Sequence, residues 1–131
     1  MAANLKGVDD RLLSYFEKAK EIFEKNSDFK VIISQGIRTE AEQLELFKKG
    51  RKEIGGKWVI IDKKNVITYT IKSKHLKGEA IDIAFIKDKK CDWSVSLFKD
   101  FWEIINKLDD LKVIKWGGNW SSFKDYPHFE I

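Results

Sequence analysis

The sequence predicts an α+β fold, in which helices pack on one face of an antiparallel sheet and leave a groove on the other face. Three segments place apolar residues at the spacing of an amphipathic helix, and short apolar or alternating segments typical of strands lie between them. The chain has 131 residues and 43% hydrophobic content, with no repeat and no low-complexity linker. We therefore expect residues 1–131 to form one domain around one core.

The first helix is expected directly after Asp9 and Asp10, because acids are favoured in the first turn of a helix. Its apolar series consists of Leu12, Leu13, Phe16, Ala19, Ile22 and Phe23. Residues 26–28 are polar and end the helix. Residues 29–34 then form a short apolar run typical of a buried strand.

A second helix is predicted to begin at Thr39, since Glu42 stands three residues later and completes a capping box. Gly50 marks its end. Its expected core face consists of Ala41, Leu44 and Phe47.

The rest of the chain alternates strands with one more helix. Residues 54–70 are rich in strand-forming residues and broken by turn signals, which indicates a hairpin or an irregular flap. Residues 78–85 alternate as a strand, residues 95–108 have helical periodicity, and residues 113–116 form a short strand. A last strand is expected after Pro127.

Composition excludes several classes of protein. The formal net charge of +4 is mild, and no basic cluster interleaved with aromatic residues indicates nucleic-acid binding. The single cysteine, Cys91, excludes an intramolecular disulfide. No apolar run is long enough to span a membrane, and the first seven residues lack the apolar core of a secretory signal. We expect synthesis in the cytoplasm.

The two histidines lie where a zinc site would need them. Asp82 and His128 are both predicted in strands whose alternate residues are apolar, so neighbouring strands would point both side chains into one groove. His75 lies seven residues before Asp82, and Gly78 between them permits a tight turn back over the strand. Two imidazoles and a carboxylate are a ligand set of hydrolytic zinc.

A hydrolytic site also needs a base and a cation. Asp125, three residues before His128, is our first choice for the base, and Glu130 is the alternative because it shares a strand face with His128. Glu79 is expected to point away. Arg38 follows the first strand in a loop and could stabilise a developing oxyanion.

Each of these patterns has an ordinary explanation when taken alone. A single histidine is usually a surface residue or a satisfied core residue, and a single arginine is usually a partner in a surface ion pair. Trp116 and Trp120 fit core packing more readily than a platform for substrate.

Three segments together resemble a known family. Ser73-x-His75-x2-Gly78-x-Ala80-x-Asp82 is similar to the signature of the zinc D-alanyl-D-alanine carboxypeptidases and the related L-alanyl-D-glutamate endopeptidases. Residues 34–39, with Glu42-Gln43 and residues 46–51, resemble the family's N-terminal motif. The segments 116–120 and 125–129 resemble its C-terminal motif, and the three segments occur in the family's order.

The resemblance implies a role for each matching residue. His75, Asp82 and His128 would bind one Zn²⁺ ion, Asp125 would be the general base, and Arg38 would bind the scissile carbonyl. The expected substrate contacts are Ser73, Gln43 and Trp116. The Trp-Gly-Gly-x-Trp segment and the aspartate at the base position look most like endopeptidases of bacteriophage endolysins, which cut the L-Ala–D-Glu bond of peptidoglycan stem peptides.

The chain departs from this pattern in places. Lys77 and Glu79 are charged where small or apolar residues are common, and residues 54–70 are longer and richer in β structure than a plain linker. We expect a monomer without a separate wall-binding domain, acting on the cell wall after release. The alternatives are a D-Ala-D-Ala carboxypeptidase of the same fold, a zinc-bearing wall-binding module without catalysis, and a structural domain without metal.

Overall fold

The computed structural model describes residues 3–66, 73–121 and 124–131. Its α-helices are α1 (Asp10–Lys25), α2 (Glu40–Lys48) and α3 (Val95–Leu108). Its strands are β1 (Lys30–Gln35), β2 (Arg51–Ile54), β3 (Lys57–Ile60), β4 (Ala80–Lys87), β5 (Lys90–Asp92), β6 (Lys115–Trp116) and β7 (His128–Glu130). Short 3-10 helices are η1 (Lys63–Asn65), η2 (Lys74–Lys77) and η3 (Gly117–Asn119).

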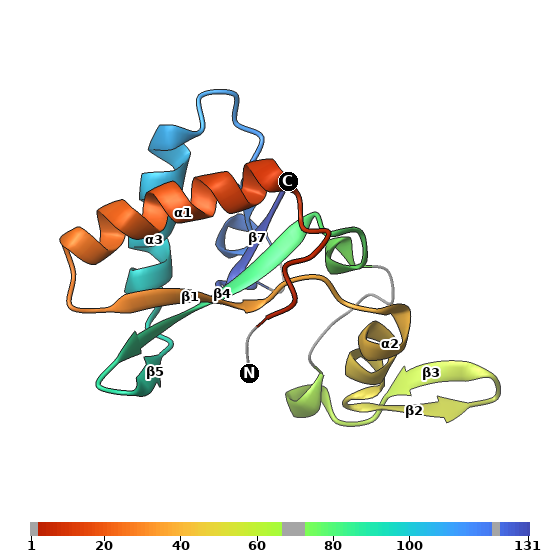
Figure 1. The fold of residues 1–131 in the computed structure, drawn as a ribbon. Helices are drawn as coiled ribbons and strands as arrows, with labels where there is room; N and C mark the ends of the chain where they lie inside the picture. Colours follow the sequence, from red (N-terminus) through yellow and green to blue (C-terminus); the bar gives the residue numbers. More distant parts are fainter. Residues whose placement is uncertain (1–2, 67–72, 122–123) are drawn as a thin grey trace.

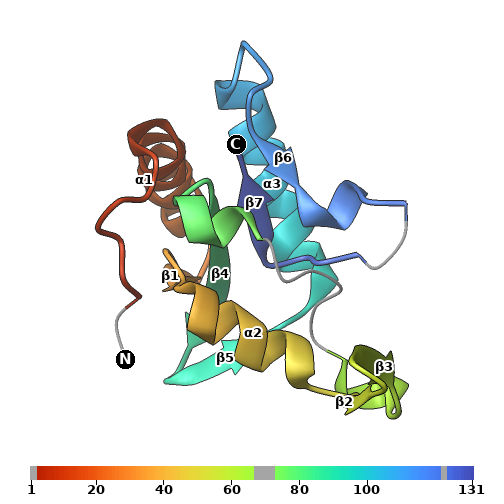
Figure 2. The same ribbon diagram turned by 90° about the vertical axis from the view of Figure 1, so that its right-hand side faces the viewer.

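The main sheet is antiparallel and has the order β1-β4-β7-β6, with β5 pairing with β4. Helices α1 and α3 lie side by side against it, whereas α2 and the β2–β3 hairpin lie on the opposite side of the molecule (Figure 1, Figure 2). The predicted α+β class is therefore confirmed. The expectation that the chain is one catalytic domain without a wall-binding domain stays a prediction.

The core lies between the two long helices and the sheet. It is rich in phenylalanine rings, namely Phe16, Phe23, Phe85, Phe98, Phe101 and Phe129. Burial of a large apolar side chain contributes on the order of 1.5–3 kcal/mol. This core fixes β4 and β7 side by side, and these two strands carry candidate ligands.

Most predicted helix and strand bounds agree with the structure. Asp9 caps α1, and the capping box of Thr39 and Glu42 is present at the start of α2. The hairpin begins earlier than predicted, at Arg51, and residues 67–70 of the predicted flap lie outside the described residues. The strand predicted over residues 113–116 is reduced to Lys115–Trp116.

The predicted core face of α2 is wrong. Ala41 and Leu44 are exposed and Phe47 is half-buried, whereas Gln43 is fully buried. The hydrophobic pattern misleads here because α2 does not pack on the main core. Its buried side instead meets the guanidinium of Arg38, which requires a polar partner.

No helix in the described part of the chain is long and apolar enough for a membrane span.

Candidate metal centre and active site

Three side chains from three separate elements meet at one point. His75 lies in η2, Asp82 in β4 and His128 in β7, and one ligand atom of each lies within 4.8 Å of the others. Asp82 Oδ1 is 3.3 Å from His75 Nε2 and 3.4 Å from His128 Nδ1. Asp82 and His128 are register partners in the antiparallel ladder, so the expected neighbouring strands are confirmed.

A left-handed glycine brings His75 over the strand. Gly78 has φ of +71° and ends η2, and its amide donates a hydrogen bond to the His75 carbonyl oxygen. A Cβ at this position would also overlap the carbonyl oxygen of Gly7. At the other end of η2, the Ser73 hydroxyl accepts a hydrogen bond from the His75 amide. The predicted tight turn is present, and only glycine fits it without strain.

Hydrogen bonds at the outer side of each ring set the tautomers of the two histidines. His75 Nδ1 lies 2.8 Å from the carbonyl oxygen of Gly36, and His128 Nε2 lies 2.8 Å from Glu130 Oε1. Both partners are acceptors, so these two nitrogens carry the hydrogen atoms. His75 Nε2 and His128 Nδ1 therefore present lone pairs toward Asp82 when the rings are neutral.

The arrangement fits a cation. The buried Asp82 Oδ1 makes no hydrogen bond with any described residue, although two imidazole nitrogens face it. Three lone pairs that converge in a buried place repel one another unless a proton or a metal ion lies among them. Two nitrogens and one carboxylate oxygen are donors that Zn²⁺ binds in open, three-ligand sites.

The electrostatics of the metal-free site show the same demand for positive charge. Burial alone would lower the pKa of His128, but the nearby carboxylates of Asp82 and Glu130 outweigh this and raise the pKa to about 9. Burial alone would raise the pKa of Asp82, but contacts with His128 and His75 hold that pKa well below its usual range. A proton on His128 thus takes the place of the cation.

Arg38 is held beside the three ligands by two amide side chains. Its Nη1 donates a 2.6 Å hydrogen bond to Gln43 Oε1, and its Nη2 donates a 3.3 Å hydrogen bond to Gln35 Oε1. Nη2 also lies 3.9 Å from Asp82 Oδ2. The backbone amide of Arg38 donates to the carbonyl oxygen of His75, so its loop is tied to η2.

Asp125 shares this electrostatic environment. Its carboxyl interacts with the charges of Asp82, His128 and Arg38, and burial together with the negative charge of Asp82 raises its pKa. A carboxylate with a raised pKa takes up a proton more readily, as a general base must. Glu130, the alternative base, has its carboxylate bound to His128 Nε2, on the side of the ring that faces away from Asp82.

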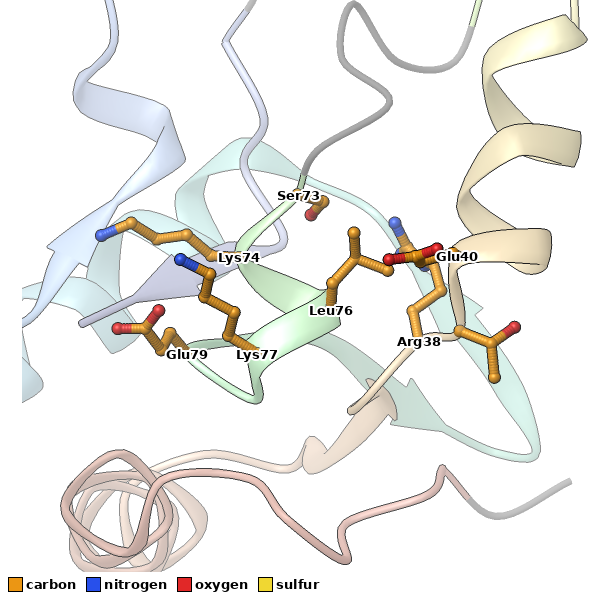
Figure 3. A pocket seen from close by; sticks show the side chains of 8 residues that line it. Arg38, Glu40, Ser73, Lys74, Leu76, Lys77 and Glu79 are labelled. Carbon is orange, nitrogen blue, oxygen red and sulfur yellow. The ribbon is translucent and has the colours of Figure 1, made fainter.

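Ser73 lines a cavity of about 640 Å³ that also reaches Arg38. Figure 3 shows Lys74 and Lys77 on one side of this cavity, Arg38 and Glu40 on the other, and Ser73 at its upper edge. The predicted place of Ser73 at the edge of the substrate site is compatible with this position.

Two of the predicted substrate contacts, Trp116 and Gln43, are buried, and their role in substrate binding stays a prediction. Trp116 is 6% exposed and stacks in the core, and its indole nitrogen donates a 2.7 Å hydrogen bond to the Tyr126 carbonyl oxygen. Gln43 is fully buried and binds Arg38. Trp120, half-buried and with its ring centroid 5.0 Å from that of His128, is the tryptophan beside the ligands.

Comparison with known proteins adds family relationships to this geometry. The sequence profile of a family described as D-alanyl-D-alanine carboxypeptidase matches residues 67–131. The chain is 35% identical to the peptidoglycan L-alanyl-D-glutamate endopeptidase CwlK of Bacillus subtilis over 81% of its own length and 63% of that protein. It is 27% identical to the L-alanyl-D-glutamate peptidase of Listeria phage A118, over its whole length but only 38% of that protein. The chain thus spans less than two thirds of either relative.

A solved structure has the same fold. The crystal structure of the L-Ala D-Glu endopeptidase ChiX of Serratia marcescens aligns with a TM-score of 0.71 over 98% of this chain and 83% of that one, at 23% sequence identity.

Proposed function

We propose that this chain, which belongs to the family of D-alanyl-D-alanine carboxypeptidases and L-alanyl-D-glutamate endopeptidases, is a zinc peptidase that hydrolyses peptidoglycan stem peptides. The bond that we propose is L-Ala–D-Glu, because the two sequence relatives are both named for that bond. The observation that carries the proposal is the convergence of His75, Asp82 and His128 around a buried oxygen that has no hydrogen-bond partner in the described part of the chain.

One Zn²⁺ ion would be held by His75 Nε2, Asp82 and His128 Nδ1. When bound, the ion supplies Lewis-acid activation of a water molecule and of the scissile carbonyl. The buried hydrogen bond from His75 Nδ1 to the Gly36 carbonyl oxygen favours the His75 tautomer that this role needs.

The remaining chemistry belongs to protein side chains. Asp125 accepts a proton from the attacking water and returns it to the leaving amine, which avoids expulsion of an unstable amide anion. Arg38 donates hydrogen bonds to the carbonyl oxygen as negative charge develops there. Gln43 and Gln35 hold the guanidinium in place before substrate binds, so little reorganisation is needed during reaction. Ser73 would contact the peptide at the rim of the cavity.

Mass spectrometry of digested peptidoglycan tests the bond. A new N-terminal D-Glu with L-Ala left on the glycan side supports the proposal. Release of free D-Ala would instead indicate the carboxypeptidase activity that the family description names. Absence of any product, in a protein that binds zinc with one-to-one stoichiometry, would indicate a non-catalytic module.

Two variants test the assigned roles in the same assay. Asp125→Ala should lower turnover by about 10²–10⁴-fold while zinc stays bound, because proton transfer is lost and the ligands remain. Arg38→Ala should lower kcat by roughly 10²–10³-fold with unchanged zinc content. Normal activity of either variant would remove that residue from the mechanism.

We also propose that the chain acts on the bacterial cell wall and that it is a monomer. Light scattering would then show a mass of 15.3 kDa.

A further inference from the structure

The carboxylate of Glu130 joins the two segments that carry the histidines. Its Oε1 lies 2.8 Å from His128 Nε2, and its Oε2 lies 3.2 Å from Lys74 Nζ. Lys74 is the residue before His75, and its Nζ also donates a 2.9 Å hydrogen bond to the Ile131 carbonyl oxygen. One carboxylate and one ammonium group thus connect η2 with β7.

We propose that Glu130, held by Lys74, is a positioning residue that fixes His128 with Nδ1 toward the metal centre. This inference rests on the proposed zinc site. The ladder supports it, because β7 pairs Asp82 with His128 and Ala80 with Glu130, which places both β7 side chains on the same face. Glu130 therefore approaches the imidazole from a rigid strand and not from a loop.

The two histidines are oriented in different ways. His75 Nδ1 donates to the backbone carbonyl of Gly36, which no side-chain substitution removes. His128 Nε2 donates to a side chain, so its orientation depends on the residue at position 130. Without that acceptor, the imidazole has no partner among the described residues to favour the Nε2–H tautomer over the Nδ1–H tautomer. A hydrogen atom on Nδ1 would block the metal.

Burial distinguishes this contact from an ordinary surface ion pair. The side chains of His128 and Glu130 are 7% and 14% exposed, so water competes poorly for the hydrogen bond between them. The side chain of Lys74 is 43% exposed, so its ion pair with Glu130 is partly open to solvent. Surface ion pairs contribute little by themselves. We therefore expect Lys74 to act through Glu130, with a smaller effect than that of Glu130 itself.

Zinc affinity tests the proposal without reference to catalysis. The full chain and its variants Glu130→Ala, Glu130→Gln and Lys74→Ala are titrated with zinc against a coloured chelator. Glu130→Ala should weaken zinc binding by about 10–100-fold, the loss typical of an outer partner of a metal-bound histidine. Glu130→Gln should recover most of the affinity, because its amide oxygen still accepts the Nε2–H hydrogen bond. Lys77→Ala, which removes the other lysine of the same 3-10 turn, is the matched control and should leave the affinity unchanged.

A second measurement reports the tautomer of the His128 ring. In the zinc-loaded protein, ¹⁵N NMR should show His128 with its hydrogen on Nε2, and Lys74→Ala should broaden or shift this signal while that of His75 is unchanged. Equal zinc affinities for Glu130→Ala, Glu130→Gln and the parent chain would overturn the proposal. So would equal losses for the alanine and glutamine variants, since these would indicate a general structural role. If Glu130→Ala fails to fold, the variants Glu130→Gln, Lys74→Ala and Lys77→Ala are compared instead. Identical zinc affinities in all three, together with a His128 signal that Lys74→Ala does not change, would contradict the proposal.

The test of the role of Glu130 can fail or succeed independently of the test of peptidase activity. A chain that binds zinc in a Glu130-dependent manner but cuts no peptidoglycan would contradict the peptidase proposal and support this one.

Discussion

Gly117 and Asp125 meet backbone to backbone beside the metal centre. The amide of Asp125 donates a 3.1 Å hydrogen bond to the carbonyl oxygen of Gly117, and a Cβ on Gly117 would overlap the carbonyl oxygen of Asp125. The amide of His128 in turn donates to that Asp125 oxygen. The first glycine of the Trp-Gly-Gly-x-Trp segment thus sets the position of the proposed base relative to a proposed ligand.

We predict that Gly117→Ala lowers kcat by about 10²-fold, because an added methyl group must displace Asp125 and small misplacements of catalytic groups are costly. Steady-state kinetics on purified peptidoglycan measure this. Gly55→Ala is the control: Gly55 has φ of +61° in the hairpin and open space around it, so strain costs about 1 kcal/mol without touching the site. Equal activities of the two variants would show that Gly117 does not position the base.

Gln43 is expected to support stability and catalysis indirectly, by holding the Arg38 guanidinium in place. Gln43→Leu removes the 2.6 Å acceptor of a buried guanidinium, which should cost about 1–3 kcal/mol of stability. Because Arg38 remains but is less well held, kcat should fall by about tenfold, less than the loss of a whole oxyanion donor. Gln35→Leu is the comparison, since Gln35 is exposed and its contact with Arg38 is longer, at 3.3 Å. A larger decrease in kcat for Gln35→Leu than for Gln43→Leu would contradict the expectation that Gln43 is the more important of the two.

Substitutions of Trp116 and Trp120 are expected to have different effects, on stability at Trp116 and on KM at Trp120. Trp116→Phe deletes the buried indole hydrogen bond to Tyr126, so the free energy of unfolding should fall by about 1–3 kcal/mol while KM is unchanged. Trp120→Ala removes the ring beside His128 and should raise KM with a smaller loss of stability. Chemical denaturation and kinetics on the same preparations separate the two effects. A raised KM for Trp116→Phe would support the substrate contact expected of Trp116.

The metal-free protein should lose stability as pH rises from about 6.5 to about 9. His128 has a pKa of about 9 in the folded chain and 6.5 as the ordinary value, so the folded state keeps a proton that the unfolded state releases in this window. The stabilisation is fully present below pH 6.5, and its slope for one proton is at most about 1.4 kcal/mol per pH unit. Denaturant unfolding in the presence of chelator, at pH 6 and pH 9.5, measures it.

Zinc-saturated protein is the control for this pH dependence. In it the metal ion replaces the proton between Asp82 and His128, so the same decrease should be absent between pH 6.5 and 9. A metal-free stability that is constant or increases over this range would mean that His128 is not held in its charged form by Asp82 and Glu130.

Local sequence patterns predicted much of the fold. The capping residues of α1 and α2, the bounds of α3 and the alternation of β4 follow from interactions within a few residues of one another. The same alternation indicated that Asp82 and His128 leave their strands on one face, and Gly78 indicated the turn that returns His75. These rules are local, so the order of residues suffices to apply them.

Contacts between distant segments needed the tertiary structure. The burial of Gln43 depends on Arg38 and on the position of α2 away from the core, and hydrophobic periodicity carries no information on that position. The burial of Trp116 and the pairing of Glu130 with His128 and Lys74 likewise depend on which strands are neighbours. The order of residues alone established the kinds of side chain available for a metal centre and the strand faces that carry them. The packing of η2, β4 and β7 decided which of them meet, because lone pairs and charges act over a few ångströms and only folding brings residues 75, 82 and 128 that close.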